Sequence, residues 1–70
     1  MIKCYSLPNC PMCEMLKEKL NENNISFEEI QDKEILKSKG ITHVPCLEME
    51  NNTILKLADA LKWVNNYGNN

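Results

Sequence analysis

The chain has 70 residues, of which 43% are hydrophobic, enough for one core, and this predicts a single domain over residues 1–70. Its net charge of −2 comes from eight lysines and ten acidic residues spread along the chain, and no basic patch indicates a nucleic-acid partner. No apolar run approaches a membrane span and no signal peptide opens the chain, so we expect no membrane partner and a reducing, cytoplasmic compartment.

Residues 1–7 alternate between two faces with the period of a β-strand. The chain is expected to turn at Pro8 and Asn9 and to enter a helix at Cys10 and Pro11. Proline suits the first helical position, because its missing N–H has no partner there in any case.

Cys10 and Cys13 lie three residues apart and so share one face of the first helical turn, close enough to form a disulfide. Cys10 is expected to face free backbone N–H groups and the positive end of the helix dipole, which both favour thiolate over thiol. In such positions a thiol pKa falls from about 8.5 to roughly 3.5–7.5. The motif therefore predicts Cys10 as a nucleophile and Cys13 as the thiol that resolves the mixed disulfide.

The middle of the chain predicts a helix, a strand and a second helix. The apolar stripe of residues 11–23 indicates the first helix, and residues 25–30 indicate a short strand. Asp32 is a suitable N-cap for the second helix, and Gly40 is suited to end it as the residue after the C-cap.

The last third of the chain predicts a hairpin and a final helix. Residues 44–50 and 53–57 are expected to pair as strands through a two-residue turn at Asn51 and Asn52, because asparagine tolerates positive φ. Asp59 is the expected N-cap of the last helix. The order β-α-β-α-β-β-α combines a right-handed parallel crossover with an antiparallel hairpin, which predicts an α/β fold with a four-stranded mixed sheet flanked by three helices.

Two motifs resemble a known family. The pattern Y-S-x-P-x-C-P-x-C over residues 5–13 resembles glutaredoxins and the glutaredoxin-like hydrogen donors of ribonucleotide reductase. The segment GITHVP, residues 40–45, resembles the loop before the cis-proline of thioredoxin-fold proteins. The resemblance implies a minimal thioredoxin fold of the glutaredoxin type and a dithiol–disulfide oxidoreductase, which needs no bound metal or organic cofactor.

The resemblance also implies a groove for the substrate. It places a cis-proline at Pro45 against the cysteine pair, and the backbone N–H and C=O of Val44 are then expected to pair with an extended substrate chain. The other substrate contacts that we expect are Tyr5, Pro11 and Met12.

Departures from the family pattern bear on the electron donor. Glutathione-using glutaredoxins carry a lysine before the motif's proline, where this chain has Leu7, and a Gly-Gly pair after the last strand, where it has Lys56 and Leu57. Lys56 and Asp59 are the remaining candidate contacts for glutathione. We expect a monomer that reduces a disulfide-bearing protein such as a reductase and is recharged by a flavoprotein like thioredoxin reductase, with glutathione as the alternative donor.

A non-enzymatic zinc-binding module is the alternative from a different class. Its ligands would be Cys10, Cys13, His43 and Cys46, since the last two also have ligand-like spacing. Against this alternative, the CxxC lacks a glycine-rich knuckle and leads directly into an amphipathic helix. Cys4 and Cys46 are expected to be buried small hydrophobes, and His43 a solvated loop residue.

Overall fold

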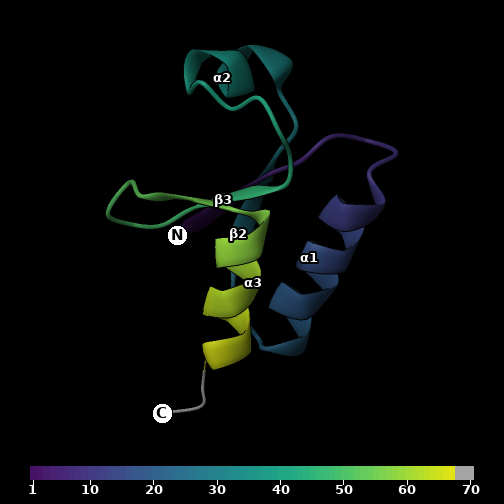
Figure 1. Cartoon of the computed structure of the whole chain (residues 1–70), viewed down its shortest axis with the longest axis vertical. Helices are drawn as coiled ribbons and strands as arrows, with labels where there is room; N and C mark the ends of the chain where they lie inside the picture. The colour runs from purple at the N-terminus through teal and green to yellow at the C-terminus, as the bar shows by residue number, and fades with distance from the viewer. Residues whose placement is uncertain (68–70) are drawn as a thin grey trace.

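The computed structural model describes residues 1–67, which form three helices and a four-stranded sheet (Figure 1). The elements follow the expected order: β1 (Ile2–Tyr5), α1 (Pro11–Glu22), β2 (Phe27–Ile30), α2 (Lys33–Ser38), β3 (Cys46–Glu48), β4 (Ile54–Lys56) and α3 (Leu57–Asn66). The strand order is β2-β1-β3-β4, in which β1 pairs parallel with β2 and antiparallel with β3, and β3 pairs antiparallel with β4. The predicted mixed α/β sheet is therefore confirmed.

The sheet separates two layers of helices. Figure 1 shows α1 and α3 together on one side of the sheet and α2 on the other. The strands serve both layers, because successive side chains point to opposite faces: Cys4 and Leu47 belong to the core under α1 and α3, whereas Tyr5 and Cys46 belong to the core under α2. The cysteine helix is thus held by the larger core, and the loop after α2 by the smaller one.

Both ends of α2 lie at the residues that the sequence predicts. The Asp32 carboxylate accepts hydrogen bonds from the N–H groups of Glu34 at 2.9 Å and Ile35 at 3.4 Å. Gly40 has a φ of 72°. Its N–H and the N–H of Ile41 donate hydrogen bonds to carbonyls in the last turn of the helix, which is a Schellman motif. None of the helices within residues 1–67 has the length and apolar character needed to cross a membrane.

The strands are shorter than their hydrophobic patterns predict. β1 ends at Tyr5 rather than residue 7, and the chain then turns at Asn9, which has φ of 60°. β3 begins at Cys46 rather than residue 44, since Pro45 has no N–H to donate to the ladder.

The hairpin turn differs from the expected two-residue turn. The N–H of Met49 donates to the carbonyl of Thr53 at 2.9 Å, and the N–H of Asn52 donates back to the carbonyl of Met49, also at 2.9 Å. Three residues, 50–52, therefore form the loop. Only Asn52 has a positive φ, of 70°, whereas a two-residue type I′ turn needs positive φ at both central residues.

Asp59 does not cap the last helix, contrary to the prediction. α3 begins at Leu57, directly after β4, so that Lys56 occupies the N-cap position and no side chain caps the helix. Asp59 lies in the first turn instead, where a carboxylate is favoured by the positive end of the helix dipole.

Candidate active site

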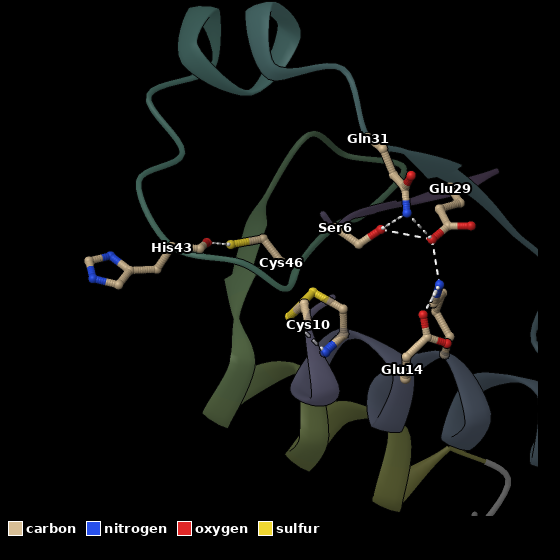
Figure 2. Close-up of a disulfide and its surroundings, with 9 residues drawn as sticks. Ser6, Cys10, Glu14, Glu29, Gln31, His43 and Cys46 are labelled. Carbon is tan, nitrogen blue, oxygen red and sulfur yellow. Dashed lines mark hydrogen bonds and ion pairs between the residues drawn. A yellow bond between two sulfur atoms is a disulfide. The ribbon is translucent and has the colours of Figure 1, made fainter. Parts of the chain in front are cut away.

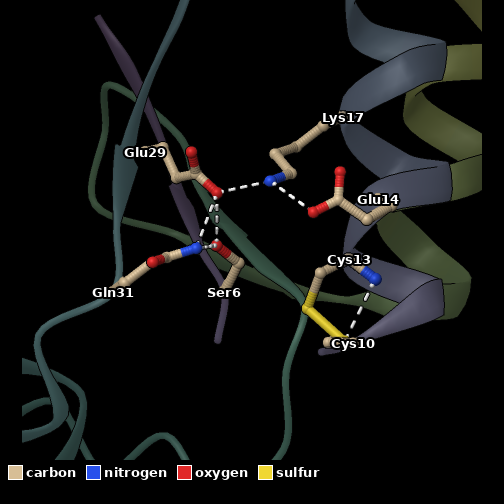
Figure 3. Close-up of polar contacts among 7 residues, drawn as sticks. All are labelled: Ser6, Cys10, Cys13, Glu14, Lys17, Glu29 and Gln31. Carbon is tan, nitrogen blue, oxygen red and sulfur yellow. Dashed lines mark hydrogen bonds and ion pairs between the residues drawn. A yellow bond between two sulfur atoms is a disulfide. The ribbon is translucent and has the colours of Figure 1, made fainter. Parts of the chain in front are cut away.

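The cysteine pair occupies the start of α1, as the sequence predicts. Cys10 is the N-cap and Pro11 the first helical residue, and the Sγ of Cys10 accepts a hydrogen bond from the backbone N–H of Cys13 at 3.1 Å. The two cysteines form a disulfide with their Cα atoms 5.2 Å apart (Figures 2 and 3). The same N–H would face a Cys10 thiolate in the reduced protein, which favours the charged sulfur.

The two sulfurs differ in access. Cys10 is half-buried, whereas Cys13 has no exposed surface. An external thiol or disulfide can therefore reach Cys10, and Cys13 is restricted to exchange with its neighbour.

The loop that leads into β3 lies against this site. The peptide bond between Val44 and Pro45 is cis, as the resemblance implied. Because Tyr5 pairs with Cys46 in the sheet, the residues just before Cys46 run beside the chain that leaves β1 toward the motif. Figures 2 and 3 both show this segment passing beside the disulfide. Pro45 is buried, and Val44 is half-buried.

The other expected substrate contacts divide into two groups. Pro11 and Met12 are exposed at the tip of α1, and Met12 has 47% of its surface accessible between the two cysteines. Tyr5 is fully buried, and its hydroxyl donates to the carboxylate of Glu48, which also pairs with Lys39 at 3.2 Å. Tyr5 therefore packs under α2 and offers no surface to a substrate in this structure.

The residues tied to glutathione differ in their surroundings. Lys56 is exposed and lines a cleft of about 260 Å³ together with Thr42 and His43. Asp59 is exposed on α3 and is not part of that cleft's lining. Leu7, where a lysine is typical of glutathione users, is half-buried against the core under α2.

The four residues of the zinc alternative do not assemble. Within residues 1–67, no three histidine, cysteine, aspartate or glutamate side chains are placed to hold a metal ion. The thiol of Cys46 donates instead to the backbone carbonyl of His43 at 3.1 Å, and the imidazole of His43 points away from the disulfide (Figure 2). Cys46 is buried as expected, and its burial raises the pKa of its thiol.

A polar network beside the disulfide was not predicted (Figure 3). One carboxylate oxygen of Glu29 accepts from Ser6 at 2.8 Å, from Lys17 at 2.6 Å and from Gln31 at 3.1 Å, and Lys17 also pairs with Glu14 at 3.0 Å. The hydrogen bonds from Lys17 and Ser6 hold the pKa of Glu29 below its usual range, and the carboxylates raise the pKa of Lys17.

The network also adjoins the second free cysteine. Burial of Cys4 raises the pKa of its thiol to about 11, and the negative charge of Glu29 adds to this shift. One signal in the sequence pointed to the network: Lys17 follows Cys13 by four residues and so shares its helix face. The partners Ser6 and Glu29 are distant in sequence, and only the parallel pairing of β1 and β2 brings them together.

Comparisons with known proteins show the family and the fold of this chain. Residues 2–54 match the sequence model of the Glutaredoxin family. An uncharacterised glutaredoxin-like 8.6 kDa protein in the rubredoxin operon of Clostridium pasteurianum is 34% identical over 62 residues, which cover 79% of this chain and 83% of that protein. A glutathione transferase homologue from Sulfitobacter, whose crystal structure holds glutathione, matches 91% of this chain with a TM-score of 0.73 at 19% identity. The chain spans only 35% of that protein, and the likeness shows a shared thioredoxin-like fold.

Proposed function

This chain belongs to the glutaredoxin family and has a thiol–disulfide redox role, and from this premise we propose that it is a dithiol–disulfide oxidoreductase acting on protein or small-molecule disulfides. The observation that carries the proposal is the contrast within the cysteine pair. Cys10 is accessible and accepts an N–H at the start of α1, while Cys13 is buried one helical turn away. This arrangement supports one attacking and one resolving thiol.

The reaction takes two exchange steps. The Cys10 thiolate attacks one sulfur of the substrate disulfide, and the other substrate sulfur leaves as a thiolate that takes up a proton. Cys13, as its thiolate, then attacks the Sγ of Cys10 and expels the second substrate sulfur, which is protonated in turn. The substrate gains two electrons and two protons, and the protein ends with the Cys10–Cys13 disulfide.

Val44 and Met12 are proposed to hold the substrate chain beside Cys10. Val44 is half-buried in the loop that passes the disulfide, and its backbone N–H and C=O suit pairing with an extended chain. Met12 offers a flexible apolar surface between the two cysteines. Buried Pro45 shapes the loop and presents no surface of its own.

We further propose that a flavoprotein of the thioredoxin-reductase type supplies the electrons, in preference to glutathione. Leu7 stands where glutathione users carry a cation, and the side chains of Lys56 and Leu57 stand where they use glycine, which blocks a close backbone approach. The similar protein from Clostridium pasteurianum belongs to a rubredoxin operon, which is in keeping with a redox setting for its partners. The exchange steps require no bound metal or organic cofactor.

The roles of the two cysteines are tested by serine variants. Cys10→Ser should abolish reduction of hydroxyethyl disulfide and insulin, and Cys13→Ser should accumulate a mixed disulfide visible by mass spectrometry. Cys46→Ser is the matched control and should retain activity. Cys46 is buried, and its thiol donates to the backbone carbonyl of His43 rather than to either cysteine of the pair. Full activity of Cys10→Ser would refute the assignment.

The electron donor is tested by direct comparison. Steady-state turnover of the wild-type protein is measured once with a thioredoxin reductase and NADPH, and once with glutathione and glutathione reductase. We expect saturable turnover with the thioredoxin reductase and slow turnover with glutathione. Efficient turnover at submillimolar glutathione together with none from the thioredoxin reductase would assign glutathione as the donor.

A further inference from the structure

A cleft lies between α2 and the two loops that frame the cysteine pair. Its volume is about 250 Å³. We call it the α2 cleft, and it is lined by Leu7, Lys33, Leu36, Lys37, Gly40, Ile41 and Thr42. Its apolar lining is preformed, because Leu36 is 5% exposed and both Leu7 and Ile41 pack against the same small core. An apolar side chain of a partner would therefore bind without reorganising the protein.

The rim of the α2 cleft is positively charged. Lys33 and Lys37 are four residues apart and so lie on the same face of α2. Both are exposed, and neither ammonium group forms an ion pair with any of residues 1–67. The acidic residues of this segment are not part of the lining: Asp32 caps the helix, and Glu34 is exposed outside the cleft. This local charge is opposite to the net charge of −2 of the chain.

The cleft is joined to the reaction site by both of its loops. Leu7 precedes Cys10 by three residues, and Thr42 precedes Pro45 by three residues. A substrate chain that pairs with the backbone of Val44 would therefore continue along residues 41–42 toward the cleft. The substrate residues that enter the cleft would then be those next to the attacked cysteine in the substrate's sequence.

We propose that the α2 cleft selects the substrate by binding a protein segment in which an apolar side chain is flanked by carboxylates. The apolar side chain fills the cleft, and the carboxylates pair with Lys33 and Lys37. This inference rests on the proposed function, because the segment must belong to a protein whose disulfide Cys10 attacks. It adds a preferred chemistry to that function: acidic and apolar residues close to the substrate cysteine.

The test uses disulfide-linked dimers of short labelled peptides, whose fluorescence rises when the bond is reduced. Three peptides differ only beside the cysteine: a leucine flanked by glutamates, a leucine flanked by lysines, and a serine flanked by glutamates. Each rate with the reduced protein is divided by the rate with dithiothreitol, which removes the effect of the charges on the peptide thiol. We expect the glutamate-flanked leucine to react roughly three- to tenfold faster than either other peptide. Added salt should reduce its advantage over the lysine-flanked peptide.

The charge of the rim is tested by a double variant, Lys33→Gln with Lys37→Gln. It should lose most of the preference for the glutamate-flanked leucine. The matched control is Lys19→Gln with Lys62→Gln, which makes the same change of charge on α1 and α3, across the sheet from α2 (Figure 1). This control should keep the preference, and all proteins should reduce the small, uncharged hydroxyethyl disulfide equally fast.

The outcomes separate the two proposals. If the wild type reduces neither hydroxyethyl disulfide nor any of the three peptide dimers, the proposed function itself is wrong. If it reduces that disulfide but treats the three peptides alike, or if both double variants lose the preference equally, the α2 cleft does not select the substrate. Sedimentation velocity measures whether the wild type dimerises. A dimer that is lost in the rim variant would assign the cleft to a second copy of this chain and would also overturn the inference.

Discussion

The Lys17 ammonium lies 2.6 Å from the Oε2 atom of Glu29 and so ties α1, which carries the cysteine pair, to β2 at the edge of the sheet (Figure 3). The same oxygen accepts from Ser6 at the end of β1, so three consecutive elements meet at one atom. The network therefore joins the cysteine helix to β2 and, through Ser6, to the start of the motif loop. It therefore contributes to the fixed position of the cysteine helix over the sheet.

Glu29→Gln should reduce stability at neutral pH and less so in acid. The pKa of Glu29 is lowered in the folded protein, chiefly by Lys17, so its contribution is present above the unfolded value of about 4.3 and is lost as the pH falls through the folded value. Because the pair is partly exposed, we expect a loss of roughly 0.5–1 kcal/mol in the free energy of unfolding at pH 7. Urea denaturation at pH 7 and pH 3 measures the difference, and equal losses at both would show that the charge is not responsible.

Tyr5→Phe should destabilise the protein more strongly. It leaves Glu48, which is 4% exposed, with Lys39 as its remaining partner, and an unmet buried acceptor costs about 1–3 kcal/mol. Burial and Glu48 raise the pKa of Tyr5 to about 12, so the stability linked to its neutral form is present below about pH 10 and is lost as the pH rises toward 12. The variant should lack this alkaline loss in urea titrations at pH 9 and pH 11.5. Tyr67→Phe, at an exposed tyrosine, is the control. It should change neither the free energy of unfolding at pH 9 nor its loss between pH 9 and pH 11.5.

Alkylation of the reduced protein at neutral pH should modify Cys10 first. Its sulfur is accessible and faces an N–H at the start of α1, while burial raises the pKa of both Cys4 and Cys46. Iodoacetamide followed by peptide mass spectrometry should therefore report a much faster rate at Cys10 than at the other two. A rate at Cys46 equal to that at Cys10 would contradict the structure. Repeating the reaction in urea is the control, because unfolding should make all the thiols similar.

The sequence was sufficient for the elements whose signals are local. Asp32 and Gly40 specify the ends of α2 through short-range hydrogen bonds, and Cys10 with Pro11 specifies the start of α1. These contacts involve residues within a few positions of one another. For this reason the element order and the placement of the cysteine pair could be predicted.

The errors arose where distant residues or competing local solutions decide the structure. Asp59 is a good N-cap by type, but β4 runs directly into α3, and the N-cap position falls three residues earlier, at Lys56. Tyr5 is the first residue of the motif, yet the alternation of β1 turns its side chain toward α2 and Glu48. The pattern of residues 25–30 predicts only that Glu29 lies in a strand, because nothing local shows that Lys17 will reach it from α1. Pairwise contacts between separate elements are what the sequence pattern leaves undetermined.

Leu7→Lys should improve the use of glutathione. It restores a cation at the position where glutathione-using members of the family carry one, three residues before Cys10. One charge-assisted hydrogen bond is worth about 1.5–3 kcal/mol, and at this half-exposed position we expect the lower end, roughly a tenfold lower half-saturating glutathione concentration. Leu7→Met is the matched control, because it keeps the apolar contact with the core under α2 and adds no charge. Turnover with a thioredoxin reductase should persist in both variants. Circular dichroism checks that Leu7→Lys folds. If the folded variant has the same half-saturating glutathione concentration as Leu7→Met, the missing cation does not limit the use of glutathione. Lys56 and Leu57 then become the positions to exchange for glycine.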